Sequence, residues 1–418
     1  MNHATNAASM RTSNRKLVLN LIRRGAISRA ELSERTQLTR ASITQIVDEL
    51  LESGLVQPCA GEEPISISAA PGRRRTLLTL KPASRFVFGV CISRRRCRVG
   101  VVDLCGTIYA AQEFALAGHT PASAADTAAR LIREQQQQLA LPAGAVLGIG
   151  VSTPGPVDHL AGRILNPPNF TDWHDVPVCE MLHSRTGLPV LLEKDTNARA
   201  LEEKYFGAAA DSAGFLLVQI DEGVGSGVSI RDALYRGTHG MGTEIGHTSI
   251  RYDGPLCSCG GRGCLENYLR IPALLAGSRF ASWDELTAHA AEPDAARLLD
   301  AAAGYLAAAL VSAINLYDLE KVVLTGEVAS CPQPLLERLN PLVSARVLSR
   351  STVQQPPVSV GGTSSVRTAA MAALYDVFQE RGGPIAFVRL HKISRNFFIW
   401  TSRRPIDTAA LFRYNLFS

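Results

Sequence analysis

Residues 244–266 read EIGHTSIRYDGPLCSCGGRGCLE and bring four metal-binding side chains into one short segment. The segment holds His247, and Cys257, Cys259 and Cys264 follow within eight positions. One imidazole and three thiolates suit structural zinc, with Zn–S distances of about 2.3 Å and Zn–N distances of about 2.0 Å. The glycines between Cys259 and Cys264 let a tight loop return the third sulfur to the metal. The segment therefore predicts a structural Zn²⁺ site.

Free thiols or an iron–sulfur cluster are the alternatives for these three cysteines. A catalytic zinc is disfavoured, because such a site keeps one coordination position open and all four are filled here. A disulfide framework is not expected in a long cytoplasmic chain. The cytoplasmic location is itself a prediction from residues 1–11, which contain no apolar core of a secretory signal.

The remaining composition is that of an ordinary folded protein of several domains. The chain has 418 residues, 46% apolar and 19% charged, which excludes a wholly disordered or collagen-like chain. No stretch reaches 18 consecutive apolar residues, and the best run, 305–316, is broken by Ser312 and Asn315. We therefore predict no membrane span and no membrane partner.

The net charge of +5 is unevenly distributed along the chain. Residues 1–85 carry 13 Lys/Arg and 7 Asp/Glu, a net charge of +6. Residues 381–418 carry 7 Lys/Arg and 1 Asp, also +6, so the middle of the chain carries about −7. A basic head on an acidic body indicates that the head meets an anion, and nucleic acid is the first candidate.

The basic head has the pattern of a winged helix-turn-helix. Residues 14–24 place Leu17, Leu21 and Ile22 on one helical face. Ser28 and Glu31 predict a capping box for a short second helix. Thr39 caps a third helix running to about residue 53, with an apolar stripe of Ile43, Ile46, Val47, Leu50 and Leu51. Residues 54–56 and 76–80 predict two strands joined by a basic tip.

The third helix also has a polar face suited to a DNA major groove. Its side chains donate hydrogen bonds to phosphates and base edges, and basic residues of the wing tip join them. The predicted DNA-binding residues are Arg40, Ser42, Thr44, Gln45, Arg73 and Arg74. The alternative is a generic three-helix bundle with a solvated basic face.

The body alternates strand-like and helical segments, which indicates an α/β architecture. Strands are predicted at 86–92, 98–103, 107–109, 146–151, 189–193, 215–220, 228–230, 321–326 and 358–360. Helices are predicted at 122–139 and 366–379.

Three motifs in this body together resemble the ROK family of repressors, open reading frames and sugar kinases. They are Glu244-Ile-Gly-His247, the CxCGxxGCxE run from Cys257 to Glu266, and Glu193-x-Asp195-x-Asn197-Ala198. The resemblance extends over about residues 10–380, and the winged head resembles the repressor branch. It implies an actin-like, ribonuclease H-like two-lobed fold with sugar bound in the cleft, and a homodimer or homotetramer.

The resemblance divides the chain into four parts. A winged helix-turn-helix spans 10–82, a small lobe 84–190 with 363–380, and a large lobe with the zinc motif 191–362. A basic, aromatic tail spans 381–418. The tail is interpreted as a lineage-specific extension, with nucleic-acid or membrane binding as the alternatives.

The family's sugar-binding motifs carry over to six positions of this chain. The implied sugar-binding residues are Asn169, Lys194, Asp195, Glu244, His247 and Glu266. His247 would serve both zinc and sugar, one ring nitrogen facing each. Lys194 departs from the family's Asn, which puts direct sugar contact there in doubt. The alternative for any single one of these residues is a surface polar group.

Kinases of the family carry a DxGxT-type turn that binds ATP phosphates, and the matching residues 91–95 here read CISRR. The Mg²⁺-organising carboxylate is replaced by Cys91, and the glycines by Ser93 and Arg94. Asp195 matches the family's catalytic base and is interpreted as vestigial. We therefore predict that the chain is not an enzyme.

The favoured function is a sugar-responsive repressor of carbohydrate genes, released from its double-stranded DNA operator by a sugar effector. The alternatives are a hexose or amino-sugar kinase with a regulatory head, and a regulator controlled by a protein partner.

Overall fold

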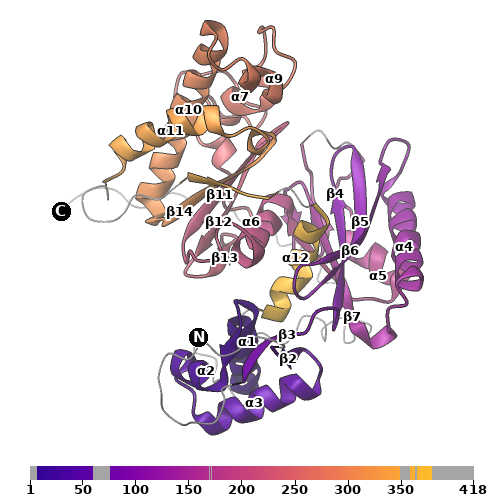
Figure 1. The fold of residues 1–418 in the computed structure, drawn as a ribbon. Coiled ribbons are helices and arrows are strands. Elements are labelled where there is room, and N and C mark those ends of the chain that lie inside the picture. Colours follow the sequence, from indigo (N-terminus) through magenta and orange to yellow (C-terminus); the bar gives the residue numbers. More distant parts are fainter. Residues whose placement is uncertain are drawn as a thin grey trace, which may run out of the picture.

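The computed structural model describes residues 7–59, 76–168, 170, 172–348, 358–362 and 365–378. Within these residues a small N-terminal head lies below a body whose two lobes each contain a β-sheet (Figure 1). The body lobes lie side by side, with the last helix between them. This arrangement confirms the predicted class, a winged helix-turn-helix followed by an α/β body.

Three helices form the head, namely α1 (Ala7–Arg23), α2 (Arg29–Thr36) and α3 (Arg40–Glu52). The predicted capping box is confirmed, because Glu31 N donates to Ser28 Oγ at 3.3 Å and Ser28 N donates to Glu31 Oε2 at 2.9 Å. The predicted cap of α3 is also present, with Ser42 N donating to Thr39 Oγ1 at 3.2 Å. These local bonds fix where the two helices of the turn begin.

Helix α1 differs from the prediction in its start and in its buried face. It begins at Ala7 rather than at residue 14. Val18, Leu19 and Ile22 are buried, whereas Leu17 and Leu21 are half-buried. Ile22 is thus buried as predicted, but the buried face also includes Val18 and Leu19, because α1 packs on both the other head helices and α12 of the body.

The wing is a small antiparallel sheet of strands β1 (Ile27–Ser28), β2 (Val56–Pro58) and β3 (Leu77–Leu80), in the order β1-β3-β2. The predicted strand pair is therefore present. The wing tip, with Arg73 and Arg74, lies outside the described residues.

The two sheets of the body share one topology. In the first, three antiparallel strands are followed by two parallel ones, in the order β10-β7-β4-β5-β6. In the second, the order β13-β12-β11-β14-β15 repeats the same directions. The strands are β4 (Phe86–Ile92), β5 (Arg96–Asp103), β6 (Ile108–Ala115), β7 (Val146–Thr153), β10 (Val190–Lys194), β11 (Phe215–Ile220), β12 (Val224–Ile230), β13 (Ala233–Tyr235), β14 (Lys321–Gly326) and β15 (Val358–Val360).

The helix that follows the last strand of each sheet packs on the other sheet. Helix α6 (Asp195–Phe206) follows the first sheet and packs on β11 and β12 of the second. Helix α12 (Ser365–Phe378) follows the second sheet and packs on β4 and β7 of the first. Glycines permit the close approach, since a Cβ on Gly89 would lie 2.1 Å from Val366 O and one on Gly227 2.6 Å from Thr196 O.

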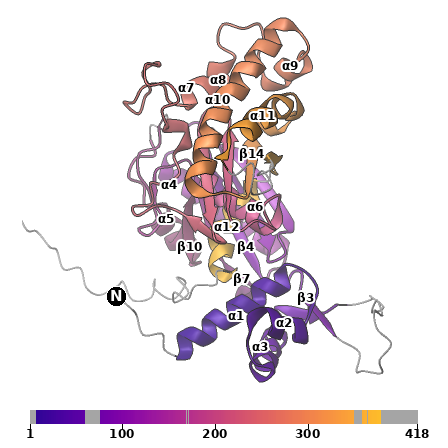
Figure 2. The same cartoon turned by 90° about the vertical axis from the view of Figure 1, so that its left-hand side faces the viewer.

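The other elements fill the connections between strands. They are α4 (Pro121–Gln138), η1 (Ala143–Ala145), β8 (Val157–Asp158), β9 (Arg163–Ile164), α5 (Val178–Thr186), η2 (Ile245–His247), α7 (Glu266–Leu269), α8 (Ile271–Leu274), α9 (Trp283–Ala288), α10 (Pro293–Tyr317), η3 (Glu327–Ala329) and α11 (Gln333–Arg346). Figure 2 shows α10 running the height of the large lobe beside α11.

Helix α10 is the one helix of the described residues that is long and apolar enough to cross a membrane by length and composition. Half of its most apolar window is buried inside the protein, against the large-lobe core. A buried core helix meets the same criteria as a span, so α10 is weak evidence for one.

Three apolar clusters form the core of the described residues. One fills the large lobe and another the small lobe. The third is shared by the head and the body, because Val18, Ile22 and Leu78 of the head belong to the same cluster as Tyr205 and Phe378. The head therefore does not have a core of its own that is separate from the body.

Candidate functional site

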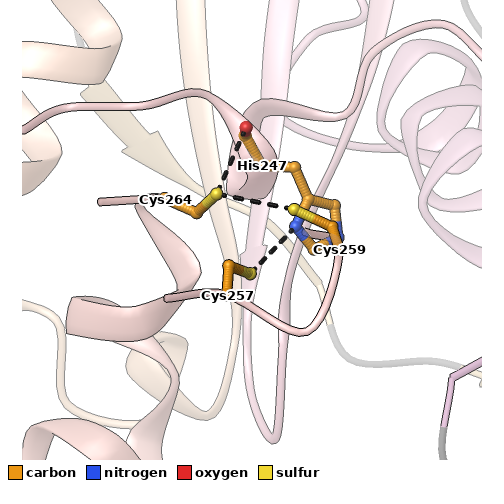
Figure 3. A group of neighbouring side chains, drawn as sticks. All are labelled: His247, Cys257, Cys259 and Cys264. Carbon is orange, nitrogen blue, oxygen red and sulfur yellow. Dashed lines mark hydrogen bonds between the residues drawn. The ribbon is translucent and has the colours of Figure 1, made fainter. Parts of the chain in front are cut away.

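The four predicted zinc ligands converge, as Figure 3 shows. The ligand atoms of His247, Cys257, Cys259 and Cys264 all lie within 4.8 Å of one another. His247 Nδ1 is 3.7 Å from Cys257 Sγ, and the Sγ atoms of Cys259 and Cys264 are 3.6 Å apart. In a tetrahedral site with Zn–S bonds of about 2.3 Å, sulfurs lie about 3.8 Å apart. The donor set and its spacing therefore fit a tetrahedral metal such as zinc.

Backbone hydrogen bonds fold the loop that carries the three cysteines. Cys257 N donates to Gly261 O at 2.8 Å, and Gly260 N donates to Cys257 O at 3.0 Å. Gly263 adopts a φ of +63°, and a Cβ there would lie 1.7 Å from Arg251 O. Only glycine is tolerated at such a position. The backbone of the loop thus helps to bring its three sulfurs together.

Burial differs among the thiols. Cys257 and Cys264 are buried, whereas Cys259 is exposed. Burial raises the pKa of Cys264 to about 12, and the backbone hydrogen bond from Gly261 lowers the pKa of Cys259. Thiolates are the metal-binding form, so the lowered pKa of Cys259 favours metal binding there.

Two of the predicted sugar-binding residues meet each other directly. Lys194 Nζ donates to Glu244 Oε1 at 2.8 Å and also lies 3.4 Å from Thr243 Oγ1. Lys194 ends β10 and is buried, while Glu244 precedes η2 in the large lobe and is exposed. This ion pair thus joins the end of the first sheet to the segment that leads into the metal site.

Asp195 is the first residue of α6, where the partial positive charge of a helix N-terminus favours a carboxylate. Its Oδ1 accepts a 2.7 Å hydrogen bond from Thr196 N. Burial raises the pKa of Asp195, and the nearby charges of Lys194 and Arg94 lower it. A carboxylate in this setting can accept bonds from ligand hydroxyls.

Glu266 and Gly246, the residue before His247, both lie against Val224 at the start of β12. Glu266 Oε2 accepts a hydrogen bond from Val224 N at 2.9 Å. Gly246, next to His247, packs so tightly that a Cβ would be 2.0 Å from Val224 O. The turn between β11 and β12 therefore holds the two ends of the metal-binding segment. Asn169 lies outside the described residues.

Sequence reasoning missed a buried network beside these residues. Arg236 Nη2 lies 2.6 Å from Glu193 Oε2, and Glu193 Oε1 accepts from Asn197 Nδ2 at 2.9 Å. The sequence contained one signal for this network, the Glu193-x-Asp195-x-Asn197 spacing, because Glu193 and Asn197 flank Asp195 at the β10–α6 junction. Arg236 comes from the other sheet and had no such signal.

The turn between β4 and β5, which matches the kinase phosphate turn, is bonded within itself and to its neighbours. Ser93 N and Oγ both donate to Arg96 O at 2.9 Å. Arg94 Nε donates to Pro168 O at 3.1 Å. Arg95 Nη2 lies 2.6 Å from Oε1 of Glu222, which belongs to the β11–β12 turn of the other lobe. The two turns thus contact each other through an exposed ion pair.

The outer face of α3 presents the predicted DNA-binding residues of the described head. Arg40, Thr44 and Gln45 are exposed and line an open hollow, while Ser42 bonds Thr39 through its side chain. The acidic residues of α3 lie in its C-terminal half, where Asp48 pairs with Arg29, Glu49 pairs with Arg11, and Glu52 is exposed. This distribution leaves the N-terminal half of α3 as its basic and polar part.

Comparisons with known proteins match both parts of the chain. A model of the ROK family matches residues 87–374, and a model of the MarR family matches residues 12–63. The xylose repressor of Bacillus subtilis is 29% identical over 357 residues, which are 83% of this chain and 91% of that protein.

Solved structures give the same division. A ROK family transcriptional regulator, a homologue of the Escherichia coli MLC protein, superposes with a TM-score of 0.74 at 26% identity, covering 88% of this chain and 98% of that one. The ROK hexokinase of Thermus thermophilus superposes with a TM-score of 0.61 at 30% identity, covering 69% of this chain and 97% of its own.

Proposed function

Because the chain belongs to the ROK family and carries a MarR-type head ahead of that family's body, we propose that it is a transcriptional repressor whose operator binding is released by a sugar. The observation that carries this proposal is the head itself. Its helix-turn-helix is capped, packed on the body and exposes Arg40, Thr44 and Gln45 on α3.

The head would bind double-stranded DNA with α3 in the major groove. Arg40, Ser42, Thr44 and Gln45 supply donors for phosphates and base edges, and Arg73 and Arg74 of the wing would add phosphate contacts. A homodimer, or a homotetramer, would set two such helices about 34–36 Å apart on successive turns of a palindromic site.

The body would bind the sugar between its lobes. The Lys194–Glu244 pair, Asp195, Glu266 and His247 offer charged donors and acceptors for vicinal hydroxyls, with Asn169 as a further contact. Zinc on His247, Cys257, Cys259 and Cys264 would stiffen the segment from Glu244 to Glu266. One rigid element would then hold three of the sugar contacts.

The chain would not act as a kinase. Phosphoryl transfer depends on positioning and on electrostatic stabilisation of the phosphates. The β4–β5 turn has Cys91 in place of a carboxylate, and its two arginines bond Pro168 and Glu222 rather than forming an open anion nest. Asp195 would then be a vestigial base that contacts the sugar alone.

The proposal includes a cytoplasmic location and the four-part division at 10–82, 84–190 with 363–380, 191–362 and 381–418. The last part lies outside the described residues. The sugar and the target genes are to be found by experiment.

Calorimetry with D-xylose, D-glucose and N-acetyl-D-glucosamine tests the sugar. We expect heat with one of them and binding weaker by about 10- to 100-fold in Asp195→Asn, because a hydrogen bond to a charged group contributes about 1.5–3 kcal/mol. Asp211→Asn, at an exposed pair with Lys321, is the control and should bind as wild type. No heat with any sugar would favour control by a protein partner.

A coupled ATP assay with the same sugars tests the kinase alternative. We expect no turnover. Sugar-dependent ATP consumption that disappears in Asp195→Asn would show an enzyme instead.

Operator binding tests the head. Arg40→Ala should weaken binding to a duplex selected by the wild-type protein from random DNA by about 1–3 kcal/mol if Arg40 contacts a base. A phosphate contact would instead lower the slope of log affinity against log salt by about 1. Arg130→Ala, on the small lobe, is the matched control. Unchanged affinity and slope in Arg40→Ala would remove this residue from the DNA-binding face.

A further inference from the structure

Arg23, the last residue of α1, holds the head to two aromatic rings of the body. Its guanidinium carbon lies 4.3 Å from the centroid of Tyr205 and 5.6 Å from that of Phe378. Its Nη1 also donates to Tyr205 O at 2.5 Å. The two rings are themselves 5.7 Å apart, so Arg23 covers both at once.

The two rings belong to helices that pack on different lobes. Tyr205 is near the end of α6, which packs on β11 and β12 of the second sheet. Phe378 ends α12, which packs on β4 and β7 of the first sheet. Figure 1 shows the end of α12 directly above α1. A change in the position of one lobe relative to the other would therefore change the surface under Arg23.

Two further contacts anchor α1 on either side of Arg23. Lys16 Nζ, which is buried, donates to Asp376 O of α12 at 2.6 Å. On the other side, Arg24 lies 3.9 Å from Asp232 Oδ1, and Lys204 of α6 pairs with the same carboxylate at 2.5 Å. Helix α1 is thus attached to both lobes along its last two turns.

The contact of Arg23 with the Tyr205 and Phe378 rings, called the joint below, is connected to the predicted sugar-binding residues. Helix α6 begins at Asp195 and rises about 15 Å, at 1.5 Å per residue, to Tyr205 under Arg23. A side-chain route runs in parallel, because Arg236 pairs with Glu193 and its guanidinium lies 5.5 Å from the centroid of Tyr375. The Tyr375 ring meets Tyr205 edge-on at 6.2 Å.

We propose that Arg23 couples the relative position of the two lobes to the DNA-binding head, so that a ligand bound between the lobes changes operator affinity through the Arg23–Tyr205–Phe378 contact. This inference rests on the proposed function, in which that ligand is a sugar. A ligand shifts such an equilibrium only by its differential affinity for the two states, and the coupling is reciprocal between sugar and operator.

The chemistry of Arg23 suits a joint that stays attached while it shifts. A planar guanidinium stacks on aromatic faces and hydrogen-bonds in its plane, whereas a lysine ammonium cannot do both. Burial lowers the pKa of Arg23 to about 10, so the side chain stays charged at neutral pH.

The test measures coupling, namely the ratio of operator dissociation constants with and without the sugar that the wild type binds in calorimetry. The operator is the duplex selected from random DNA. With a wild-type ratio of about tenfold or more, Arg23→Ala should reduce the ratio to within about twofold of 1. Its sugar affinity without DNA should stay within about twofold of wild type, because Arg23 does not contact the predicted sugar-binding residues.

The control is Arg279→Ala, which removes a guanidinium 4.5 Å from the Phe280 ring in the large lobe. This variant should keep the wild-type ratio. A full wild-type ratio in a folded Arg23→Ala would overturn the proposal. If Arg23→Ala does not fold, Arg23→Lys and Phe378→Leu take its place. Each should lower the ratio, and an unchanged ratio in both would equally overturn it.

Failure of the proposed function gives a different result, in which the wild type itself binds no sugar. The joint is then tested by hydrogen exchange in full-length Glu222→Lys, in which repulsion from Arg95 weakens the contact between the lobes at the opposite end. The last turn of α1 should exchange faster than in wild type, and this increase should be absent when Arg23→Ala is added. The same increase with and without Arg23, or no increase at all, would contradict the joint.

Discussion

The two sheets of the body have the same strand order and the same strand directions, yet the chain uses their equivalent parts differently. The clearest case is the turn between the first two strands of each sheet. In the small lobe this turn carries Arg94 and Arg95, and in the large lobe it carries Asp221 and Glu222. The two turns face each other, and Arg95 pairs with Glu222 at 2.6 Å.

This difference shows that equivalent turns of two sheets with one topology can carry opposite charges. Two glycine-rich turns that face each other can hold an anion between their backbone amides. In this protein the two turns carry opposite charges, so each turn supplies a counter-charge for the other. The residues next to the metal site are paired differently, because Glu244 pairs with Lys194 while Asp195, at the start of α6, accepts a backbone hydrogen bond from Thr196 N.

The connections between the third and fourth strands differ even more. In the small lobe this connection is essentially α4, whereas in the large lobe it contains the metal site and the helices from α7 to α10. A second lobe with this insertion has a rigid element that the first lobe lacks. The predictions below test these contrasts.

Loss of the metal should have the largest effect, and it should fall on the large lobe. Structural zinc contributes about 10–16 kcal/mol to folding in zinc-finger peptides. We expect Cys259→Ser to lose zinc and about 4 kcal/mol of stability, a fall in Tm of about 10 °C. Metal analysis and calorimetry measure both. Sugar affinity should fall before operator affinity does.

Cys331→Ser is the matched control, since Cys331 lies outside the cluster and is similarly a free thiol. It should keep its zinc and its Tm. If Cys259→Ser retained normal sugar response with no metal, the stiffening role assigned to zinc would be wrong.

The exchange of helices between the sheets predicts matched effects at two glycines. Gly89→Ala places a Cβ 2.1 Å from Val366 O, and Gly227→Ala places one 2.6 Å from Thr196 O. Overpacking of this kind costs about 1–3 kcal/mol, and we expect Gly89→Ala to cost more than Gly227→Ala. Thermal unfolding measures both. Gly304→Ala, where a Cβ meets nothing within 4 Å, should instead stabilise α10 by up to about 1 kcal/mol. If Gly227→Ala left the free energy of unfolding unchanged, α6 would not be as tightly packed on the second sheet as α12 is on the first.

The ion pair between the turns should have the smallest effect on stability. Arg95 and Glu222 are exposed, and such pairs contribute about 0.2–1 kcal/mol. A double-mutant cycle of Arg95→Ala and Glu222→Ala should give a coupling energy in this range. Neither variant should gain ATP binding in calorimetry. Restored ATP binding in the double variant would show that the pair, rather than the lost carboxylate at Cys91, keeps nucleotide out.

Local sequence signals predicted the parts of the structure that depend on nearby residues. The capping box at Ser28 and Glu31, the cap at Thr39 and the convergence of His247 with three cysteines all follow from short spacings. Most strands of both sheets were also predicted, since buried strands carry continuous apolar runs. Strand β13 and the first half of β12 were missed, because the glycines of residues 223–227 indicated a turn.

The parts that depend on distant residues were not predicted. The face of α1 was misplaced because it is buried against α12, which lies at the other end of the chain. The Lys194–Glu244, Arg236–Glu193 and Arg95–Glu222 pairs each join the first sheet, or a turn between its strands, to a segment connected to the second sheet, and no periodicity or spacing links their members. The residues that join the lobes were therefore visible only in three dimensions.

The core shared by head and body limits how this protein can be recombined with its relatives. Val18, Ile22 and Leu78 pack in the same cluster as Tyr205 and Phe378. A chimera joined in the connection near residue 82 would place the head of another protein against Tyr205 and Phe378, which pack with the side chains of this protein's own head. Retaining operator recognition in such a hybrid requires the last turns of α6 and α12 to come from the same parent as α1. The unit that evolution can exchange intact is thus the head together with those two helix ends.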